Sequence, residues 1–243
     1  MITLDVYLAA CGCSDAESAA QGGRTLYDFD WIDRRLTELC RHLLIESLKE
    51  TVEKVTGWVR PSGREVDEAL RRRKPNVFRF ADDGFIPNNP DLAFILYRSP
   101  VRVTSAPDPA ALFEVLFARN GWKNSWRNGI YEYAHYHSQI HEVLGIARGA
   151  AMVRFGGSKG RIVKLRAGDV AVLPAGIGHQ RLEGDDDFLV VGAYPASGKY
   201  DECRASPEER DRALKTIPRV PLPKKDPVYG SGGPLARLWL KRV

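Results

Sequence analysis

The stretch GIYEYAHYHSQIHEVLGIARG, from Gly129 to Gly149, contains three histidines, of which His135 and His137 are separated by one residue. Side chains alternate between the two faces of an extended strand, so both imidazoles should project to the same side. Glu142 follows His137 at an odd offset and would point to the opposite side of an unbroken strand. We therefore expect a turn or bulge at Ser138-Gln139-Ile140. A second strand beside the first would then bring two imidazoles and one carboxylate to a common centre.

A second stretch, GDVAVLPAGIGHQRLE from Gly168 to Glu183, offers a third imidazole, that of His179. Its first two residues suit a tight turn, and the β-branched run that follows suits a short strand. Pro174 and Gly176 then turn the chain before the histidine. Imidazole and carboxylate ligands together suit Fe, Mn, Ni, Cu or Zn, so the ligand types leave the identity of a metal open.

Together the two stretches resemble the paired motifs of the cupin superfamily, G(X)5HXH(X)4E(X)6G and G(X)5PXG(X)2H, at every fixed position. One place departs from the common pattern, because Glu183 stands where cupins often have Asn. The resemblance implies an all-β core, a double-stranded antiparallel β-helix or jelly-roll barrel, with helices in an N-terminal extension and flanking the barrel. It also implies a divalent transition metal inside the barrel, with the ligands His135, His137, Glu142 and His179.

Further segments, the first of which runs into the first motif, resemble the bacterial single-domain cupins called YjlB-like, a branch without a characterised function. They are residues 122–133, the run Pro87-Asn-Asn-Pro90, and residues 191–195 with the proline-rich end. The likeness extends from about Phe78 to the C-terminus. It therefore implies a fold and metal ligands but no substrate.

The composition, 44% apolar and 28% charged residues in a chain of 243, is typical of a soluble globular protein. No apolar run is long enough to span a membrane. The net charge of +5 is spread along the chain, and we expect the basic cluster Arg71-Arg-Arg-Lys74 to be a solvated helix end rather than a nucleic-acid site. The four cysteines have no repeated spacing, which favours a reducing cytoplasm.

Two parts of the chain differ in pattern. Residues 1–74 are expected to form a helical N-terminal extension, partly disordered, with a helix whose apolar residues recur between Ile32 and Val55 and a shorter one that a capping box opens at Ser62. This extension could cover the barrel or mediate a homodimer. Residues 75–243 are expected to form the cupin domain, with its metal-binding core at about 122–195.

Within the cupin domain, the sequence predicts further elements around the two motifs. Helices should begin after Asp108 and after the capping box at Ser206. The tail after about Thr216 is rich in proline and glycine and predicts no regular structure. Strands are predicted at 77–80, 92–97, 151–155, 162–165, 170–173 and 188–194.

Residues 121–128 are expected to form a loop at the barrel mouth that carries Trp122, Trp126 and Arg127. Arg127 could hold an anionic or carbonyl-bearing ligand as a bidentate clamp and take part in catalysis. The alternative is that the tryptophans plug the end of the barrel and that Arg127 pairs with a surface acid. His141 should face outward by alternation, at the surface or behind the ligands.

These features predict three classes of function. The first is a metal-dependent enzyme of dioxygenase type that acts on a small organic substrate inside the barrel. The second is a metal-dependent isomerase or lyase, in which Glu142 or Glu183 moves a proton. The third is a non-catalytic metal or small-ligand binding protein, such as a sensor. An enzyme needs an open metal position that a pocket with convergent polar groups can reach, whereas a structural metal would be fully ligated and dry.

Overall fold

The computed structural model describes residues 60–204 and 206–240, so the predicted helix at 32–55 lies outside the described residues. The elements are α3 (Gly63–Ala69), β1 (Asn76–Phe78), β2 (Phe94–Tyr97), the 3-10 helix η1 (Val103–Ser105), α4 (Pro109–Arg119), β3 (Trp122–Asn128), β4 (Glu142–Arg148), β5 (Ala150–Phe155), β6 (Arg161–Arg166), β7 (Val170–Leu173), β8 (His179–Gly184), β9 (Leu189–Pro195), α5 (Pro207–Thr216), η2 (Ile217–Arg219) and α6 (Leu235–Leu240).

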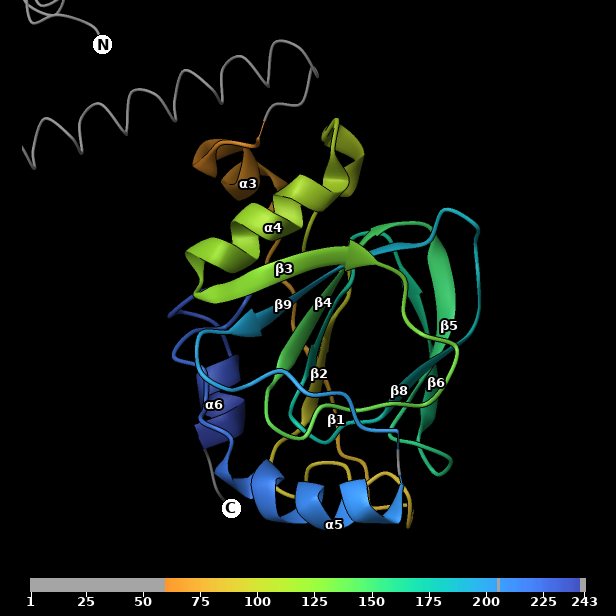
Figure 1. Cartoon of the computed structure of the whole chain (residues 1–243). Coiled ribbons are helices and arrows are strands. Elements are labelled where there is room, and N and C mark those ends of the chain that lie inside the picture. Colours follow the sequence, from red (N-terminus) through yellow and green to blue (C-terminus); the bar gives the residue numbers. More distant parts are fainter. Residues whose placement is uncertain (1–59, 205, 241–243) are drawn as a thin grey trace, which may run out of the picture. The chain divides into compact units, whose positions relative to one another are not determined.

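The strands form two antiparallel sheets that face each other (Figure 1). The larger sheet has the order β1-β2-β7-β4-β9-β3, and the smaller has the order β6-β5-β8. The chain passes repeatedly between them, because β4, β7 and β9 belong to the larger sheet, whereas β5, β6 and β8 belong to the smaller. This arrangement is the double-stranded antiparallel β-helix, or jelly roll, that the sequence motifs predicted.

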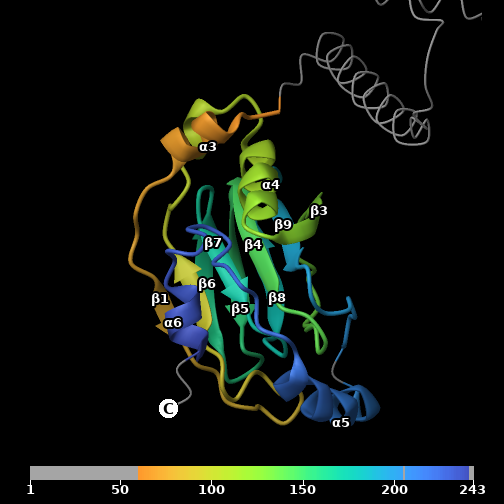
Figure 2. The same ribbon diagram turned by 90° about the vertical axis from the view of Figure 1, so that its left-hand side faces the viewer.

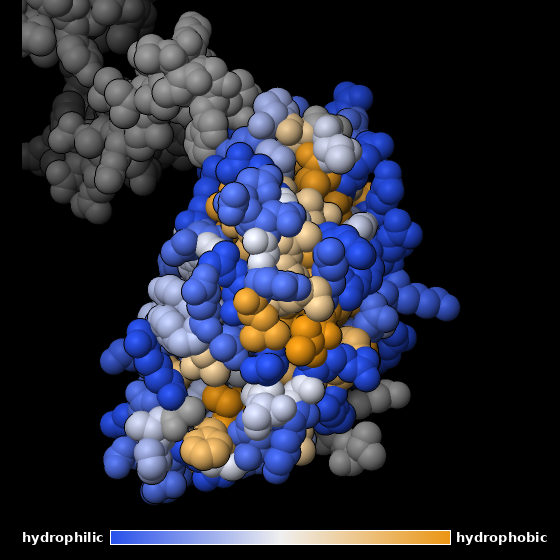
Figure 3. Space-filling view, turned by 90° about the vertical axis from the view of Figure 1, so that its right-hand side faces the viewer, coloured by the Kyte–Doolittle hydropathy of each residue, from blue (hydrophilic) through white to orange (hydrophobic). Residues whose placement is uncertain are grey.

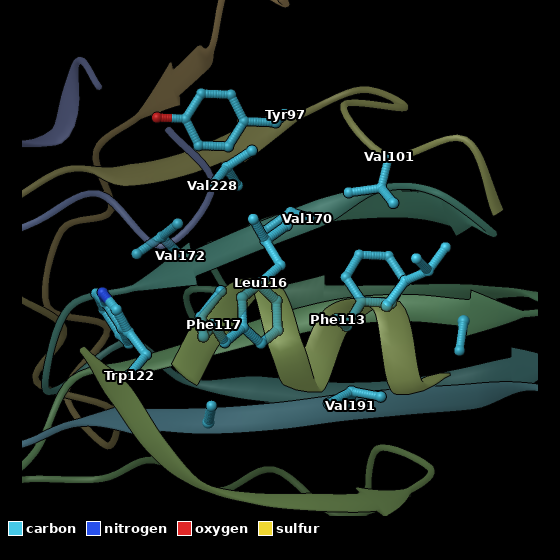
Figure 4. Packing of buried hydrophobic residues seen from close by; sticks show 14 of the residues in the cluster. Tyr97, Val101, Phe113, Leu116, Phe117, Trp122, Val170, Val172, Val191 and Val228 are labelled. Atoms are coloured by element: carbon cyan, nitrogen blue, oxygen red, sulfur yellow. The ribbon is translucent and has the colours of Figure 1, made fainter. Parts of the chain in front are cut away.

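The larger sheet is covered on both faces. Helices α3, α4 and α6 lie over its outer face (Figure 2), where Phe113 and Phe117 of α4 pack against Val172 and Val191 (Figure 4). Its inner face packs against the smaller sheet through a second cluster that includes Phe94, Leu144 and Phe155. Burial on both faces explains why β2 and β7 are apolar at every position instead of alternating.

The outer face of the smaller sheet has no such cover among the described residues. Ile162 of β6 and Leu182 of β8 are exposed large apolar side chains. Figure 3, which views the molecule from the side of this sheet, shows apolar residues gathered within a mostly hydrophilic surface. No helix of the described residues is long and apolar enough to cross a membrane.

The predicted helix starts are confirmed. Asp108 caps α4 by accepting a hydrogen bond from the Ala110 amide, and Ser62 and Ser206 form complete capping boxes. The basic run 71–74 is exposed but follows α3 instead of ending it, because Leu70 already has extended backbone angles. Val66 of α3 is buried in the cluster on the outer face of the larger sheet, so α3 packs with the β-domain.

Three predictions about secondary structure are wrong. The segment of His135 and His137 is not a strand beside β4, because it forms only isolated bridges, with His179 and Cys203, whereas β4 pairs with β7 and β9. Residues 122–128, expected as a loop, form the edge strand β3, which pairs with β9 through a register irregularity between Lys123 and Trp126. Edge strands tolerate such bulges and polar outward residues, which conceal the strand pattern. The tail is also not entirely irregular, because α6 packs Trp239 into the outer cluster, with its indole N–H donating to the Ala93 carbonyl.

The contact between α4 and β4 depends on Gly145. A Cβ atom at this position would lie 2.5 Å from Cδ1 of Phe113. We expect Gly145→Ala to lower the free energy of unfolding by about 1–3 kcal/mol, because the buried Phe113 ring has to shift. Chemical denaturation measures the change. Gly63→Ala is the matched control, since a Cβ there meets nothing within 4 Å and alanine favours the helix; equal stability of Gly145→Ala and wild type would contradict the prediction.

Candidate metal centre

The three predicted imidazoles lie together inside the barrel. The backbones of His135 and His179 pair with each other, with the His135 amide donating to the His179 carbonyl at 3.2 Å and the reverse bond at 2.9 Å. This pairing joins the first motif to the start of β8. One ligand atom from each of His135, His137 and His179 lies within 4.8 Å of the other two, and all three side chains are buried.

Glu142 reaches the same place because the chain bends between the motif histidines and β4. The bends fall at Ser138 and Gln139, within the turn that the sequence predicted, and β4 begins at Glu142. Glu142 and Leu144 then share the inner face of the larger sheet, whereas Val143 points to the outer cluster. The Glu142 Oε2 atom lies 3.4 Å from the Nε2 atoms of both His137 and His179.

Backbone carbonyl groups fix the tautomer of all three histidines. Nδ1 of His135 lies 3.2 Å from the carbonyl oxygen of Tyr133, and Nδ1 of His179 lies 3.3 Å from that of Ile177. Nδ1 of His137 is hydrogen-bonded to the carbonyl oxygen of Asp201. A carbonyl oxygen can only accept, so each Nδ1 carries a proton. In its neutral form each ring therefore has the lone pair on Nε2, the atom needed to bind a metal.

The three histidines of the cluster differ in pKa, and His137 is the one whose pKa is raised. Burial lowers the pKa of His135, and burial together with the other two imidazoles lowers the pKa of His179 well below its usual value. Burial also disfavours a charged His137, but the Glu142 carboxylate and the Asp201 carbonyl outweigh it and raise the pKa of His137 to about 9. At neutral pH the cluster thus holds one imidazolium beside one carboxylate.

The residues fit a divalent transition metal. Glu142 is only 2% exposed, and its Oε2 atom has no hydrogen-bond partner of acceptable geometry among the described residues. Such an oxygen is costly to bury unless a cation compensates it, and either the protonated His137 of the metal-free cluster or a bound metal ion would do so. Two ligand atoms that each lie about 2.1 Å from one ion are about 3.0–3.4 Å apart in octahedral or tetrahedral geometry. The two separations of 3.4 Å at Glu142 agree with this range.

A cavity of about 320 Å³ opens above the four side chains. Four aromatic side chains line it besides the histidines: Trp126 of β3 and Tyr194 of β9 on neighbouring strands, and Tyr131 and Tyr200 at 43% and 51% exposure. The Trp126 indole N–H donates to the Tyr194 hydroxyl oxygen at 2.9 Å, so these two rings hold each other in place. The cluster therefore forms part of the wall of a space that is large enough for a small organic molecule.

Arg127 also borders this cavity, but its guanidinium is bound to carboxylates. Its Nε and Nη2 donate to Glu114 at 2.7 Å, and its Nη1 donates to Asp108 at 2.8 Å. The structure thus has the ion pair that the sequence left open as the alternative to a ligand clamp. The two tryptophans have different roles. Trp122 is a core residue, buried in the cluster on the outer face of the larger sheet, whereas Trp126 lines the cavity.

His141 points away from the cavity, as alternation predicted, but it is fully buried instead of lying at the surface. Its Nδ1 accepts a hydrogen bond from the Ala175 amide at 2.9 Å, so its tautomer is opposite to that of the three clustered histidines. Its ring packs against Trp239 of α6, which sequence patterns did not reveal. Glu183 is exposed on β8 and does not line the cavity, so it is not placed to move a proton there.

Sequence reasoning missed the segment that follows β9. Tyr200 lines the cavity with its ring centroid 5.1 Å from that of His137, and Asp201 supplies the carbonyl oxygen for the same histidine. No spacing marks these residues, because they lie more than 60 positions from His137 and reach it only through tertiary structure. For Tyr194 the sequence predicted only that it lies in a buried strand, not that its hydroxyl borders the cavity.

The raised pKa of His137 predicts how metal binding depends on pH. Below about pH 9 the metal-free cluster carries a proton on His137 that a metal must displace. The apparent affinity for Zn²⁺ should therefore rise by about tenfold per pH unit from pH 7 toward pH 9 and then level off, with about one proton released per ion at pH 7. Titration calorimetry in buffers of different ionisation enthalpy counts this proton, and release of none at pH 7 would contradict the assignment.

Comparisons with known proteins locate the chain among its relatives. No family model matches the sequence. The chain is 41% identical over 169 residues to the uncharacterized protein YjlB of Bacillus subtilis (strain 168), an alignment that covers 70% of this chain and 99% of the relative.

Solved structures give weaker likenesses. A protein with a double-stranded β-helix domain from Klebsiella pneumoniae is 15% identical, with a TM-score of 0.27 and coverage of 61% of this chain and 99% of that one. Acireductone dioxygenase from Bacillus anthracis with a cadmium ion in its active center is 21% identical, with a TM-score of 0.27 and coverage of 35% of this chain and 59% of that one. Scores of this size carry no argument about function. The identity across nearly all of the Bacillus subtilis protein does establish kinship: the chain belongs to the YjlB family, and its two facing antiparallel sheets have the cupin fold.

Proposed function

We propose that this protein is a metal-dependent enzyme of dioxygenase type that acts on a small organic substrate inside the barrel. One observation carries the proposal: the Nε2 atoms of three buried imidazoles, each with its Nδ1 bound to a backbone carbonyl, converge with a buried carboxylate beside an open cavity. A purely structural metal site would be closed and dry. Here the same side chains that would hold the metal also border a space for a second ligand.

His135, His137, His179 and Glu142 would hold the metal. A divalent transition metal at this point would supply Lewis acidity and a template for oxygen atoms of the substrate. Four protein ligands leave up to two positions of an octahedral ion for other groups. The donor set of nitrogen and oxygen atoms suits Fe, Mn, Ni, Cu or Zn, so metal analysis of the purified protein has to identify the ion.

The remaining wall residues orient the substrate and restrict water. Tyr194 accepts a hydrogen bond from Trp126, and burial together with the Glu142 charge raises the pKa of Tyr194. Its hydroxyl therefore keeps its proton and can donate it in a hydrogen bond to Glu142 or to a substrate oxygen. The apolar side chains of Ile130 and Leu144 complete the inner wall. Flat molecules suit such a space, because aromatic walls favour stacked or edge contacts.

Arg127 contributes less to the proposal than the sequence suggested. An anionic substrate would have to compete with Glu114 and Asp108 for its guanidinium. The site therefore favours a substrate that is anchored by its own oxygen atoms at the metal position. Arg127 is better understood as the link that holds β3 to α4, since Glu114 belongs to that helix.

A metal-dependent isomerase or lyase is the second candidate. The observation that favours it is the proximity of a proton donor and a proton acceptor at the cavity, Tyr194 and Glu142, because proton transfer between substrate carbons needs such groups. Oxygen consumption separates the two reactions. A non-catalytic binding protein would show neither oxygen consumption nor conversion of a substrate.

The metal ligands can be tested by substitution. We expect His137→Ala and Glu142→Gln to lose metal, by at least tenfold in occupancy, and to keep the folded barrel, because each removes one ligand and leaves both apolar clusters intact. Protein purified without a chelating tag is analysed for metals by mass spectrometry, and circular dichroism reports the fold. Glu183→Gln is the matched control, since this exposed glutamate should not affect metal content. Wild-type metal content in His137→Ala would refute the assignment.

The reaction type can be tested with the metal-loaded protein. We expect Fe(II)-loaded wild type to consume O₂ in the presence of some members of a panel of small planar oxygen-bearing compounds, and His137→Ala to consume none above background. An oxygen electrode measures uptake, and mass spectrometry of the products detects incorporated ¹⁸O. Conversion of a compound without oxygen uptake would favour the isomerase or lyase, and equal uptake by wild type and His137→Ala would contradict both.

A further inference from the structure

The orientation of His137, which lies in no strand, depends on contacts from outside its own segment. Tyr136 pairs through its backbone with Cys203, at 3.0 and 2.9 Å, but the regular pairing ends there and the chain bends at Ser138 and Gln139. A histidine beside a bend is not held by a sheet on both sides. Its ring needs other contacts if Nε2 is to stay directed at the metal position.

Asp201 supplies those contacts from the segment that follows β9. Its carbonyl oxygen accepts the hydrogen bond from His137 Nδ1. Its carboxylate accepts from the two backbone amides after the histidine, those of Ser138 at 3.0 Å and Gln139 at 3.0 Å, and from the Ser138 hydroxyl at 2.6 Å. One residue thus binds both the imidazole and the turn next to it.

We propose that Asp201 is a positioning residue of the metal centre, which holds His137 in the tautomer and orientation required for metal binding. The Asp201 carbonyl group keeps the proton of His137 on Nδ1. The Asp201 carboxylate holds its own segment against the turn at Ser138 and Gln139, so that the hydrogen bond from Nδ1 to the carbonyl oxygen can form. This role rests on the proposed function of the site. It predicts that the side chain of Asp201 controls metal affinity although it does not itself contact the metal.

The chain contains a matched control for a purely structural role. Asp83 accepts from the backbone amides of Phe85 and Ile86 with one oxygen, and from the amide and hydroxyl of Ser158 with the other, at 2.7 to 2.9 Å. Its pattern is similar to that of Asp201, since both accept from two successive backbone amides and a serine hydroxyl, but Asp83 accepts from one further amide and does not line the metal cavity. Loss of either carboxylate should destabilise the fold to a similar degree, and only Asp201 should affect the metal.

The test compares Asp201→Ala, Asp201→Asn and Asp83→Ala in the full chain. Zn²⁺ affinity is measured by competition with a chromophoric chelator, and the melting temperature of the zinc-free protein reports stability. We expect Asp201→Ala to weaken Zn²⁺ binding by about 10- to 100-fold, and Asp83→Ala to change it by less than about twofold. Asp201→Asn should stay close to wild type, because its amide oxygen still accepts from the two backbone amides. Equal effects of Asp201→Ala and Asp83→Ala on zinc affinity would overturn the proposal.

A second readout does not require metal. In zinc-free protein at a pH above about 9, where the His137 ring is neutral, ¹⁵N chemical shifts of the imidazoles distinguish a ring with its proton held on Nδ1 from a mixture of tautomers. We expect the His137 signal to change in Asp201→Ala and to stay unchanged in Asp83→Ala. Absence of zinc binding in wild type would refute the proposed function, whereas an unchanged His137 signal in Asp201→Ala would refute the positioning role.

Discussion

The burial of three imidazoles and a carboxylate inside an apolar barrel is the constraint on which the rest of the site depends. Each polar atom that loses water without gaining a partner costs about 1–3 kcal/mol, and a charged group costs more. Backbone carbonyls satisfy the three Nδ1 atoms, which leaves the Nε2 atoms and Glu142 Oε2 as the groups that need compensation. A cation at their centre would compensate them together, which is the physical reason that this cluster and a metal belong together.

The same constraint makes it necessary that the larger sheet is packed on both faces, against the helices on its outer face and against the smaller sheet on its inner face. Strand β4 carries Glu142 and Leu144 on its inner face and Val143 on its outer face, so one strand forms the metal site and supports the α4 layer at once. Phe113 of α4 packs where Gly145 leaves room for its ring. A shift of β4 by one residue would turn Glu142 out of the cavity and bury it among apolar side chains. Packing on the outer face therefore fixes the register on which the inner chemistry depends.

The cavity and the metal cluster are coupled by shared residues. Tyr200 lies against His137 and borders the opening, and the next residue, Asp201, binds the same imidazole. Trp126 and Tyr194 link the edge strand β3 to β9, and the Tyr194 ring extends this wall to Tyr200, with ring centroids 5.5 Å apart. A ligand that changes the position of the segment 200–203 would therefore also affect the histidine behind it.

The sequence by itself determined the fold class, the β-strands and helix caps around the motifs, and the histidines that meet. These follow from local rules: side-chain alternation, capping boxes and two motifs at fixed spacing. Other features were decided only by tertiary structure. The β3 edge strand carries bulged polar residues, α6 follows a proline- and glycine-rich tail, Arg127 is bound by acids of another element, and Asp201 reaches His137 from a distant segment. Each of these depends on contacts between residues far apart in the chain, whose energies no local pattern records.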